Sequence, residues 1–247
     1  MKTIEFFSTI PGVAEAYPII EAKNYRPNWT KAAMQDLVNK KNNIVNNDTG
    51  RFTHLSYCPG IFDLFKTGYI VPMWYDIYIK TEKNKPGFSW TVADKSFGTL
   101  SDIKFIDTHN EEMTNFIPKR KGTINSIVKI NTPWNVIVPE NLKFLCLPIS
   151  YPEHFDYEST SGILDSSLSS ELNIQMNWNV EEGEILIKAG TPLMHIIPLS
   201  EKTFNLEVRT ANKKDLQWTN IQKYCKTFSF STTRHLVQKL YRNFFKR

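Results

Sequence analysis

Five histidines are the first side chains in this sequence that could carry acid–base or metal chemistry: His54, His109, His154, His195 and His235. None of them forms an HxH pair or an HExxH motif, so a metal site would need residues that lie far apart in the chain. His109 lies in the acidic segment 107–112 and could act there as a general base or a metal ligand. An exposed polar loop explains this segment more simply, and no metal site is predicted.

Hydroxyl and thiol side chains are the next candidates. Residues 166–170 read SSLSS, but no GxSxG motif surrounds any of these serines, so turn chemistry explains them better than nucleophilic catalysis. Cys58, Cys146 and Cys225 are odd in number and far apart, which predicts reduced thiols in a cytoplasm instead of a disulfide framework or a zinc pair.

Tryptophans and a basic turn could together bind a nucleotide. Trp134 and Trp178 fall on or beside candidate strands, as do Trp74 and Trp90, and the turn PKRKG carries Lys119, Arg120 and Lys121. Aromatic rings stack on bases, and cations bind phosphates. Tryptophans on strands are more often core residues and such a turn is more often solvated, so both interpretations stay open.

Short strands are expected to position these residues. From residue 60 to residue 80 the sequence becomes aromatic and β-branched, and 73–80 alternates as a strand does. Further strand candidates are 88–92, 123–130, 134–138, 143–147, 172–177, 184–187, 193–198 and 203–208. Many short strands separated by turns predict a mainly β protein with a sandwich or barrel-like core.

Helices are expected only at the two ends of the chain. Residues 28–45 form a helix candidate that Asn28 or Thr30 could cap, inside an otherwise polar and irregular region. Residues 234–247 read RHLVQKLYRNFFKR, which is typical of an amphipathic helix with a basic outer face. The predicted organisation is an N-terminal extension with one helix (1–54), a β-rich core domain (55–210) and a basic C-terminal segment with a helix (211–247).

Composition excludes several classes of protein. With 10 glycines among 247 residues, the chain contains neither GxGxxG nor a P-loop. No apolar run approaches the length of a membrane span, and Glu5 and Pro11 interrupt any signal-peptide core, so a cytoplasmic protein is expected. The net charge of +5 could attract an anion without requiring one.

Three segments between residues 131 and 199 follow one another in an informative order: SGILD at 161–165, a strand candidate at 171–177, and IKAGTPLMHIIP at 187–198. This order resembles the β-clip core of the dUTPase and dCTP deaminase superfamily. The resemblance implies that Asp165 in a hairpin accepts hydrogen bonds from a sugar hydroxyl or orients a water, and that a side chain at Gly162 would be obstructed. It also implies that Asp165 and His195 lie on adjacent elements.

The catalytic motifs of that superfamily are missing, so the resemblance implies a fold and a binding surface but not the activity. SSLSS stands where the superfamily has an aromatic residue and Arg-Gly-Glu, PISYP stands where its serine-rich phosphate motif falls, and His195 replaces its glutamine. Mg²⁺-dependent pyrophosphate hydrolysis would lack ligands. The candidate ligand-binding residues are therefore Gly162, Asp165, His195, Trp134, Trp178, Arg120 and Lys119, with no catalytic residue, metal or cofactor.

A second likeness spans most of residues 55–210: CPGIFDLFKTGYIVPMWYDIYI, KINTPWNVIVP and the block from GILD to GTPLMHIIP resemble a family of uncharacterised proteins of tailed phages and bacteria. We therefore expect a non-catalytic phage or bacterial protein that binds a small anionic, nucleotide-like ligand, for example to sequester a signalling nucleotide. The alternatives are a virion or other protein-interaction component and, less favoured, a nucleotide hydrolase. Because β-clip proteins often build sites between subunits, a homotrimer or homodimer is expected, whereas nucleic-acid binding through the basic C-terminus is less favoured.

Overall fold

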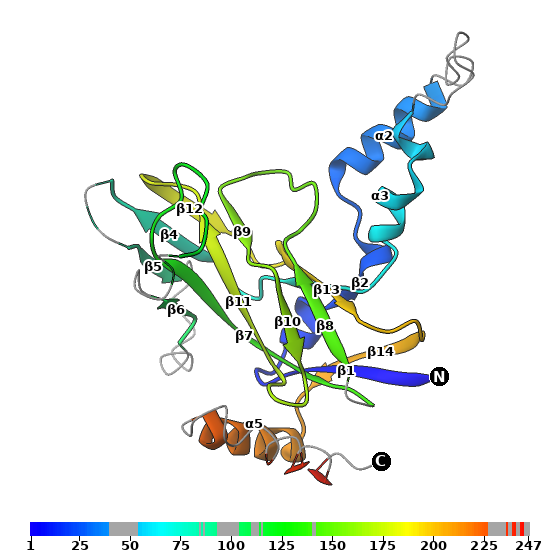
Figure 1. The fold of residues 1–247 in the computed structure, drawn as a ribbon, viewed down its shortest axis with the longest axis vertical. Coiled ribbons are helices and arrows are strands. Elements are labelled where there is room, and N and C mark those ends of the chain that lie inside the picture. Colours follow the sequence, from blue (N-terminus) through cyan, green and yellow to red (C-terminus); the bar gives the residue numbers. More distant parts are fainter. Residues whose placement is uncertain are drawn as a thin grey trace.

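The computed structural model describes residues 1–39, 54–83, 85, 87–92, 104–109, 114, 116–139 and 142–226, with residues 236, 239, 240, 243 and 244 near the C-terminus. Its strands form three sheets, which confirms the predicted mainly β class (Figure 1). No described helix is long and apolar enough to cross a membrane.

The largest sheet has the strand order β14-β1-β7-β11-β9, with β6 also paired to β7. Its strands are β1 (Lys2–Ser8), β6 (Ile106–His109), β7 (Ile127–Ile137), β9 (Tyr157–Ser159), β11 (Glu171–Trp178) and β14 (Phe204–Thr210). β1 pairs in parallel with β14, and its other partner, β7, is antiparallel. The two ends of the described β-region therefore meet in one sheet.

The second sheet has the order β10-β8-β13-β3-β2 and the third has the order β12-β4-β5. The second contains β2 (Ile20–Glu21), β3 (Tyr69–Pro72), β8 (Lys143–Leu147), β10 (Gly162–Asp165) and β13 (Pro192–Pro198). The third contains β4 (Ile77–Thr81), β5 (Ser89–Val92) and β12 (Gly183–Ile187). All of their pairings are antiparallel.

One hydrophobic core joins the three sheets. Alternation along β11 turns Leu172, Ile174, Met176 and Trp178 inward, because successive side chains of a strand point to opposite faces. The Tyr157 ring stacks on Trp178, with their centroids 5.5 Å apart. The buried side chains of β9 and β11 therefore hold both strands against the core.

The helices lie outside the three sheets. They are α1 (Val13–Ala16), the 3₁₀ turns η1 (Ala22–Asn24) and η2 (Leu55–Tyr57), α2 (Asn28–Asn39), α3 (Pro59–Leu64) and α5 (Lys213–Lys226). α2 and α3 project side by side from the sheets, joined by a contact between the Trp29 and Phe62 rings, whereas α5 lies at the opposite end (Figure 1).

The structure corrects two expectations about the N-terminal third. Residues 2–8 are not irregular: they form β1, because Ile4, Phe6 and Phe7 are fully buried between its neighbouring strands and the core. The alternation at 73–80 does not form one strand, because 73–76 lie between β3, which ends at Pro72, and β4, which begins at Ile77. Residues 59–64 form α3, which Pro59 starts at a position where proline is tolerated. The helix predicted at 28–45 is confirmed over Asn28–Asn39, and its remainder lies outside the described residues.

The C-terminal helix of the structure, α5, begins earlier than the helix expected at 234–247, most of which lies outside the described residues. Its start is capped reciprocally: Asn212 Oδ1 accepts hydrogen bonds from the Lys214 and Asp215 amides, and the Asp215 carboxylate accepts one from the Asn212 amide. Trp218 of α5 is fully buried and contacts the Phe244 ring.

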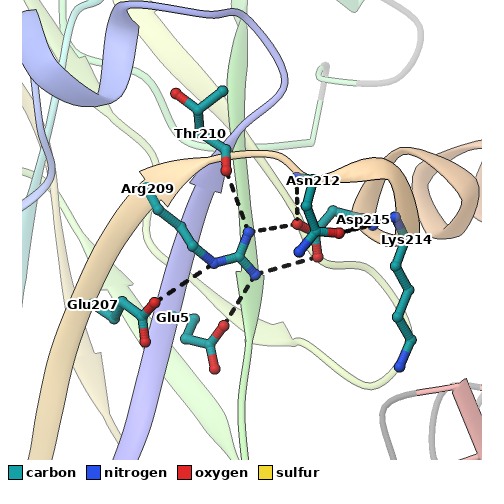
Figure 2. A network of polar contacts seen from close by, with 7 residues as sticks. All are labelled: Glu5, Glu207, Arg209, Thr210, Asn212, Lys214 and Asp215. Carbon is teal, nitrogen blue, oxygen red and sulfur yellow. Dashed lines mark hydrogen bonds and ion pairs between the residues drawn. The ribbon is translucent and has the colours of Figure 1, made fainter.

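A buried charge network attaches α5 to the largest sheet (Figure 2). The Arg209 guanidinium on β14 binds both Asp215 of α5 and, at 3.0 Å, the Glu5 carboxylate of β1. Glu5 and Asp215 are each only 2% exposed, whereas the more distant Glu207 is half exposed. We call Glu5, Arg209 and Asp215 the α5 latch.

Candidate functional site

Asp165 and Gly162 lie on β10, and two expectations drawn for them are wrong. β10 pairs with β8 in the second sheet, so it forms no hairpin with β11, which belongs to the largest sheet. A Cβ added at Gly162 would have no atom within 4 Å, so a side chain is not obstructed there. Asp165 accepts hydrogen bonds from the Ser167 amide (3.2 Å) and hydroxyl (2.6 Å), which makes it part of a turn.

His195 is a hydrogen-bonded core histidine on β13, 1% exposed. Its Nε2 lies 2.6 Å from the Thr67 carbonyl oxygen, and because a carbonyl only accepts, Nε2 carries the hydrogen. Burial lowers the pKa of His195, which keeps the ring neutral. The structure does not bring it beside Asp165: on β8, Asp165 pairs with Lys143 and His195 with Leu147, about 13 Å further along the strand.

Trp134 and Trp178 are fully buried in the core, so neither ring faces solvent for base stacking. Lys119 is held in its turn, where Nζ donates to the Asn125 carbonyl at 2.8 Å. Arg120 is different, because its side chain is 60% exposed and pairs with Glu158 of β9 at 3.1 Å. Of the predicted ligand-binding residues, Arg120 lines a surface pocket and Gly162 lines a smaller, separate cavity.

We call the surface pocket at Arg120, a cavity of about 490 Å³, the aromatic pocket. Its lining residues are Tyr25, Arg120, Pro148, Ile149, Tyr151, Pro152, Glu153, His154, Phe155, Tyr157, Glu158, Ser159, Thr191, Pro192 and Leu193. Its size lies in the range of small-molecule sites, and aromatic walls with a few polar groups are typical of them. Phe155 and Tyr151 are 66% and 52% exposed, which leaves ring surface available to a ligand.

The loop of residues 148–156, which supplies seven of the 15 residues that line this pocket, is fixed at several points. Tyr151 has a φ of 53°, a left-handed conformation that costs a residue with a side chain about 1–2 kcal/mol. Its carbonyl accepts a hydrogen bond from Trp29 Nε1 at 3.2 Å. Glu153 accepts hydrogen bonds from the amide and the side chain of Asn28, so a carboxylate from this loop caps α2. The loop is therefore clamped between α2 and the sheets.

Two tyrosines of the pocket have raised pKa values. Burial, with a smaller contribution from the Glu153 charge, raises the pKa of Tyr25, and burial with the Asp156 charge raises the pKa of Tyr157 well above its ordinary value. Both phenols are therefore neutral hydrogen-bond donors near neutral pH. The ring of His154 packs against Tyr157 at 4.4 Å, and its buried Nδ1 has no hydrogen-bond partner among the described residues.

Sequence reasoning missed the aromatic members of this pocket. Residues 148–155 read PISYPEHF, where His154 and the missing serine-rich phosphate motif drew attention but the aromatic rings did not. Tyr151 lies between Pro148 and Pro152, and His154 and Phe155 follow directly, which indicates exposed rings on a rigid loop. Tyr25 and Arg120 come from distant segments, and no local pattern joins them to this loop.

Metal chemistry has no cluster of side chains to support it within the part of the chain that is described: no group of three His, Cys, Asp or Glu side chains there could hold an ion. His109 lies at the end of β6, while Glu111 and Glu112 lie outside the described residues. Cys58 and Cys146 are free thiols, and burial raises the pKa of Cys146 to about 11.

No family model and no curated protein matches the chain.

Proposed function

We propose that this chain is a non-catalytic phage or bacterial protein that binds a nucleotide-like ligand in the aromatic pocket. The observation that carries the proposal is the position of Arg120, an exposed cation at the edge of a cavity whose walls present Tyr25, Tyr151 and Phe155. Aromatic faces stack on a base of any sequence, and a guanidinium binds phosphate with two parallel hydrogen bonds.

A phosphate can replace Glu158 as the partner of Arg120. Both side chains are partly exposed, and surface ion pairs contribute little to stability, so a phosphate with several anionic oxygens can displace the carboxylate. Lys119 and Lys121 in the same turn add positive charge. The released Glu158 can then accept hydrogen bonds from ribose hydroxyls, as acidic residues do in other nucleotide sites.

The absence of catalysis is part of the proposal because the carboxylate expected to orient a water is engaged elsewhere. Asp165 binds its own turn through Ser167 and is not among the residues that line the aromatic pocket. Release of phosphate from nucleoside triphosphates in the presence of Mg²⁺ would contradict this part of the proposal and restore the hydrolase alternative.

Calorimetric titration with nucleoside mono-, di- and triphosphates and cyclic nucleotides tests the binding. For the nucleotide that binds, Arg120→Ala is expected to weaken affinity by about 10- to 100-fold, because it removes a charge-assisted contact to phosphate. Phe155→Ala should weaken it by about 10-fold through lost stacking. The control Lys80→Ala removes a half-exposed cation on β4 that also pairs with a glutamate, outside the pocket, and should leave affinity unchanged. No heat of binding across the panel would overturn the proposal.

A second candidate function, a protein-interaction or virion component, is favoured by exposed apolar side chains. Phe116 is 94% exposed, and Ile163 is 57% exposed on the edge strand β10. Apolar residues and an open strand edge favour association between chains. This function, with the proposed homotrimer or homodimer, requires an assembly in light scattering, and a monodisperse monomer without a copurifying protein would count against it.

A further inference from the structure

We propose that the ligand carries a hydroxyl-rich group beyond its phosphates, which makes it a nucleoside diphosphate sugar or a close analogue, and that this group binds in a polar groove beside the aromatic pocket. The inference rests on the proposed function, because the groove extends the same site. It names the class of ligand that the aromatic pocket and the groove would bind together.

The groove consists of two further cavities, of about 480 and 220 Å³, that we call together the amide groove. The larger one shares Pro148, Glu158 and Ser159 with the aromatic pocket. The two parts of the groove share Thr160, Ser161 and Gln175. The three cavities therefore adjoin one another along the chain segment that leads from β9 to β10.

Strand alternation produces the wall of this groove. The inward side chains of β11 are apolar, so the intervening residues Asn173, Gln175 and Asn177 share the opposite face, about 7 Å apart. All three line the groove. A row of side-chain amides of this kind offers both donors and acceptors and carries no charge.

Unsatisfied hydrogen-bonding groups indicate what the groove would bind. The side-chain oxygens of Asn173 and Asn177 are buried and have no hydrogen-bond partner among the described residues. A buried acceptor without a partner costs about 1–3 kcal/mol, and rotation of the amide toward the groove would let a ligand hydroxyl satisfy it. Hydroxyls both donate and accept, so they match amide and serine or threonine side chains better than an anion or an apolar group does.

The shared wall orders the parts of the ligand. Glu158 lines both the aromatic pocket and the groove, and its partner Arg120 lines the aromatic pocket. A base among the aromatic rings and phosphates at Arg120 would direct the group attached to the last phosphate across Glu158 into the amide groove. A free nucleoside phosphate would leave the groove empty.

Isothermal titration calorimetry with uridine and adenosine diphosphates, each with and without an attached glucose, tests the inference. We expect the glucose to strengthen binding of the preferred diphosphate by about 10-fold or more. Gln175→Ala should remove this gain and leave affinity for the diphosphate alone unchanged. The matched control is Asn205→Ala, which removes an exposed amide from β14 at the far edge of the same sheet and should preserve the gain.

The possible results separate this inference from the function on which it rests. If the diphosphates bind and glucose adds nothing, the groove is not a carbohydrate subsite, while the proposed function stands. If glucose adds affinity that Gln175→Ala does not reduce, the sugar lies elsewhere and the inference is wrong. If neither diphosphate nor its glucose conjugate binds, the inference is wrong, whereas the proposed function fails only if the full panel of nucleotides also shows no heat of binding. Binding of glucose oligosaccharides alone would show that the groove accepts glycans without a nucleotide.

Discussion

Among the described glycines, Gly68 has the most constrained backbone position. Its φ is +83°, and a Cβ there would lie 2.3 Å from the Ile196 carbonyl oxygen of β13. Thr67, the residue before it, accepts the hydrogen bond from His195. The approach of this turn to β13, and with it the hydrogen bond of His195, therefore depends on the absence of a side chain at Gly68.

Comparing three glycine substitutions separates the two causes of this constraint. Gly68→Ala is expected to lower the free energy of unfolding by about 3 kcal/mol or more, since it adds a backbone clash to a left-handed φ. Gly12→Ala has φ +82° but open space, so it should cost about 1–2 kcal/mol, and Gly162→Ala, which has neither problem, should lie within about 0.5 kcal/mol of wild type. Urea denaturation measures all three, and equal losses at Gly68 and Gly12 would contradict the claimed clash.

The buried neutral His195 predicts a pH dependence of stability. Burial lowers its folded pKa below the unfolded value of about 6.5, so the unfolded chain binds more protons as the pH falls below that value. The stability that the neutral His195 contributes is complete above about pH 7 and is lost on acidification. The free energy of unfolding then falls by at most about 1.4 kcal/mol per pH unit. Urea denaturation at pH 7.5 and 5.5 should show a smaller loss for His195→Gln, whose amide can still donate to Thr67. An unchanged loss would show that His195 does not titrate as described.

For single residues, the sequence predicts the chemistry of a side chain better than its position in the fold. Arg120 was predicted as a ligand contact and does lie at a pocket, because an exposed turn can be inferred from PKRKG alone. Trp134 and Trp178 are core residues, and the sequence cannot decide whether a strand tryptophan faces inward until the sheets that cover it are known.

Among the secondary-structure elements, strands with clear patterns or flanking turns were predicted closely. The expected strands at 143–147, 184–187 and 193–198 correspond to β8, β12 and β13 within a residue. The candidates 123–130 and 134–138 overlap the single strand β7, which begins only at Ile127 and ends at Ile137, because Pro133 between them does not interrupt the extended chain. α5 was missed, although Asn212 and Asp215 have the spacing of a reciprocal helix cap.

The α5 latch predicts how that helix is held. Arg209→Leu is expected to lower the free energy of unfolding by about 3–5 kcal/mol, because it removes the guanidinium from two buried carboxylates, Glu5 and Asp215. Glu207→Gln is the control, since its half-exposed contact at 3.7 Å should contribute less than about 1 kcal/mol. Hydrogen exchange of the Arg209→Leu variant should show that the amides of α5 lose protection first. Wild-type protection of α5 in Arg209→Leu would mean that Trp218 and its neighbours hold the helix without the latch.

For the whole molecule, the class of fold was predictable and the assembly of the sheets was not. Alternation identifies a strand but not its partner, so it cannot indicate that β1 pairs with β14, some 200 residues away, or that β10 and β11 lie in different sheets. The β-clip fold and the domain boundaries remain predictions. The aromatic pocket depends on this assembly, because its lining comes from α2-proximal, β9 and β13 segments together.

The proposed function places a nucleotide-like ligand in the aromatic pocket. A crystal structure of the protein purified from its native host, or soaked with the nucleotide that binds most tightly in solution, tests it most directly. We predict density for a base against Tyr151 or Phe155, with phosphate at Arg120 and the Arg120–Glu158 ion pair broken. A nucleotide bound at another site, with this pocket empty and the ion pair intact, would contradict the claim.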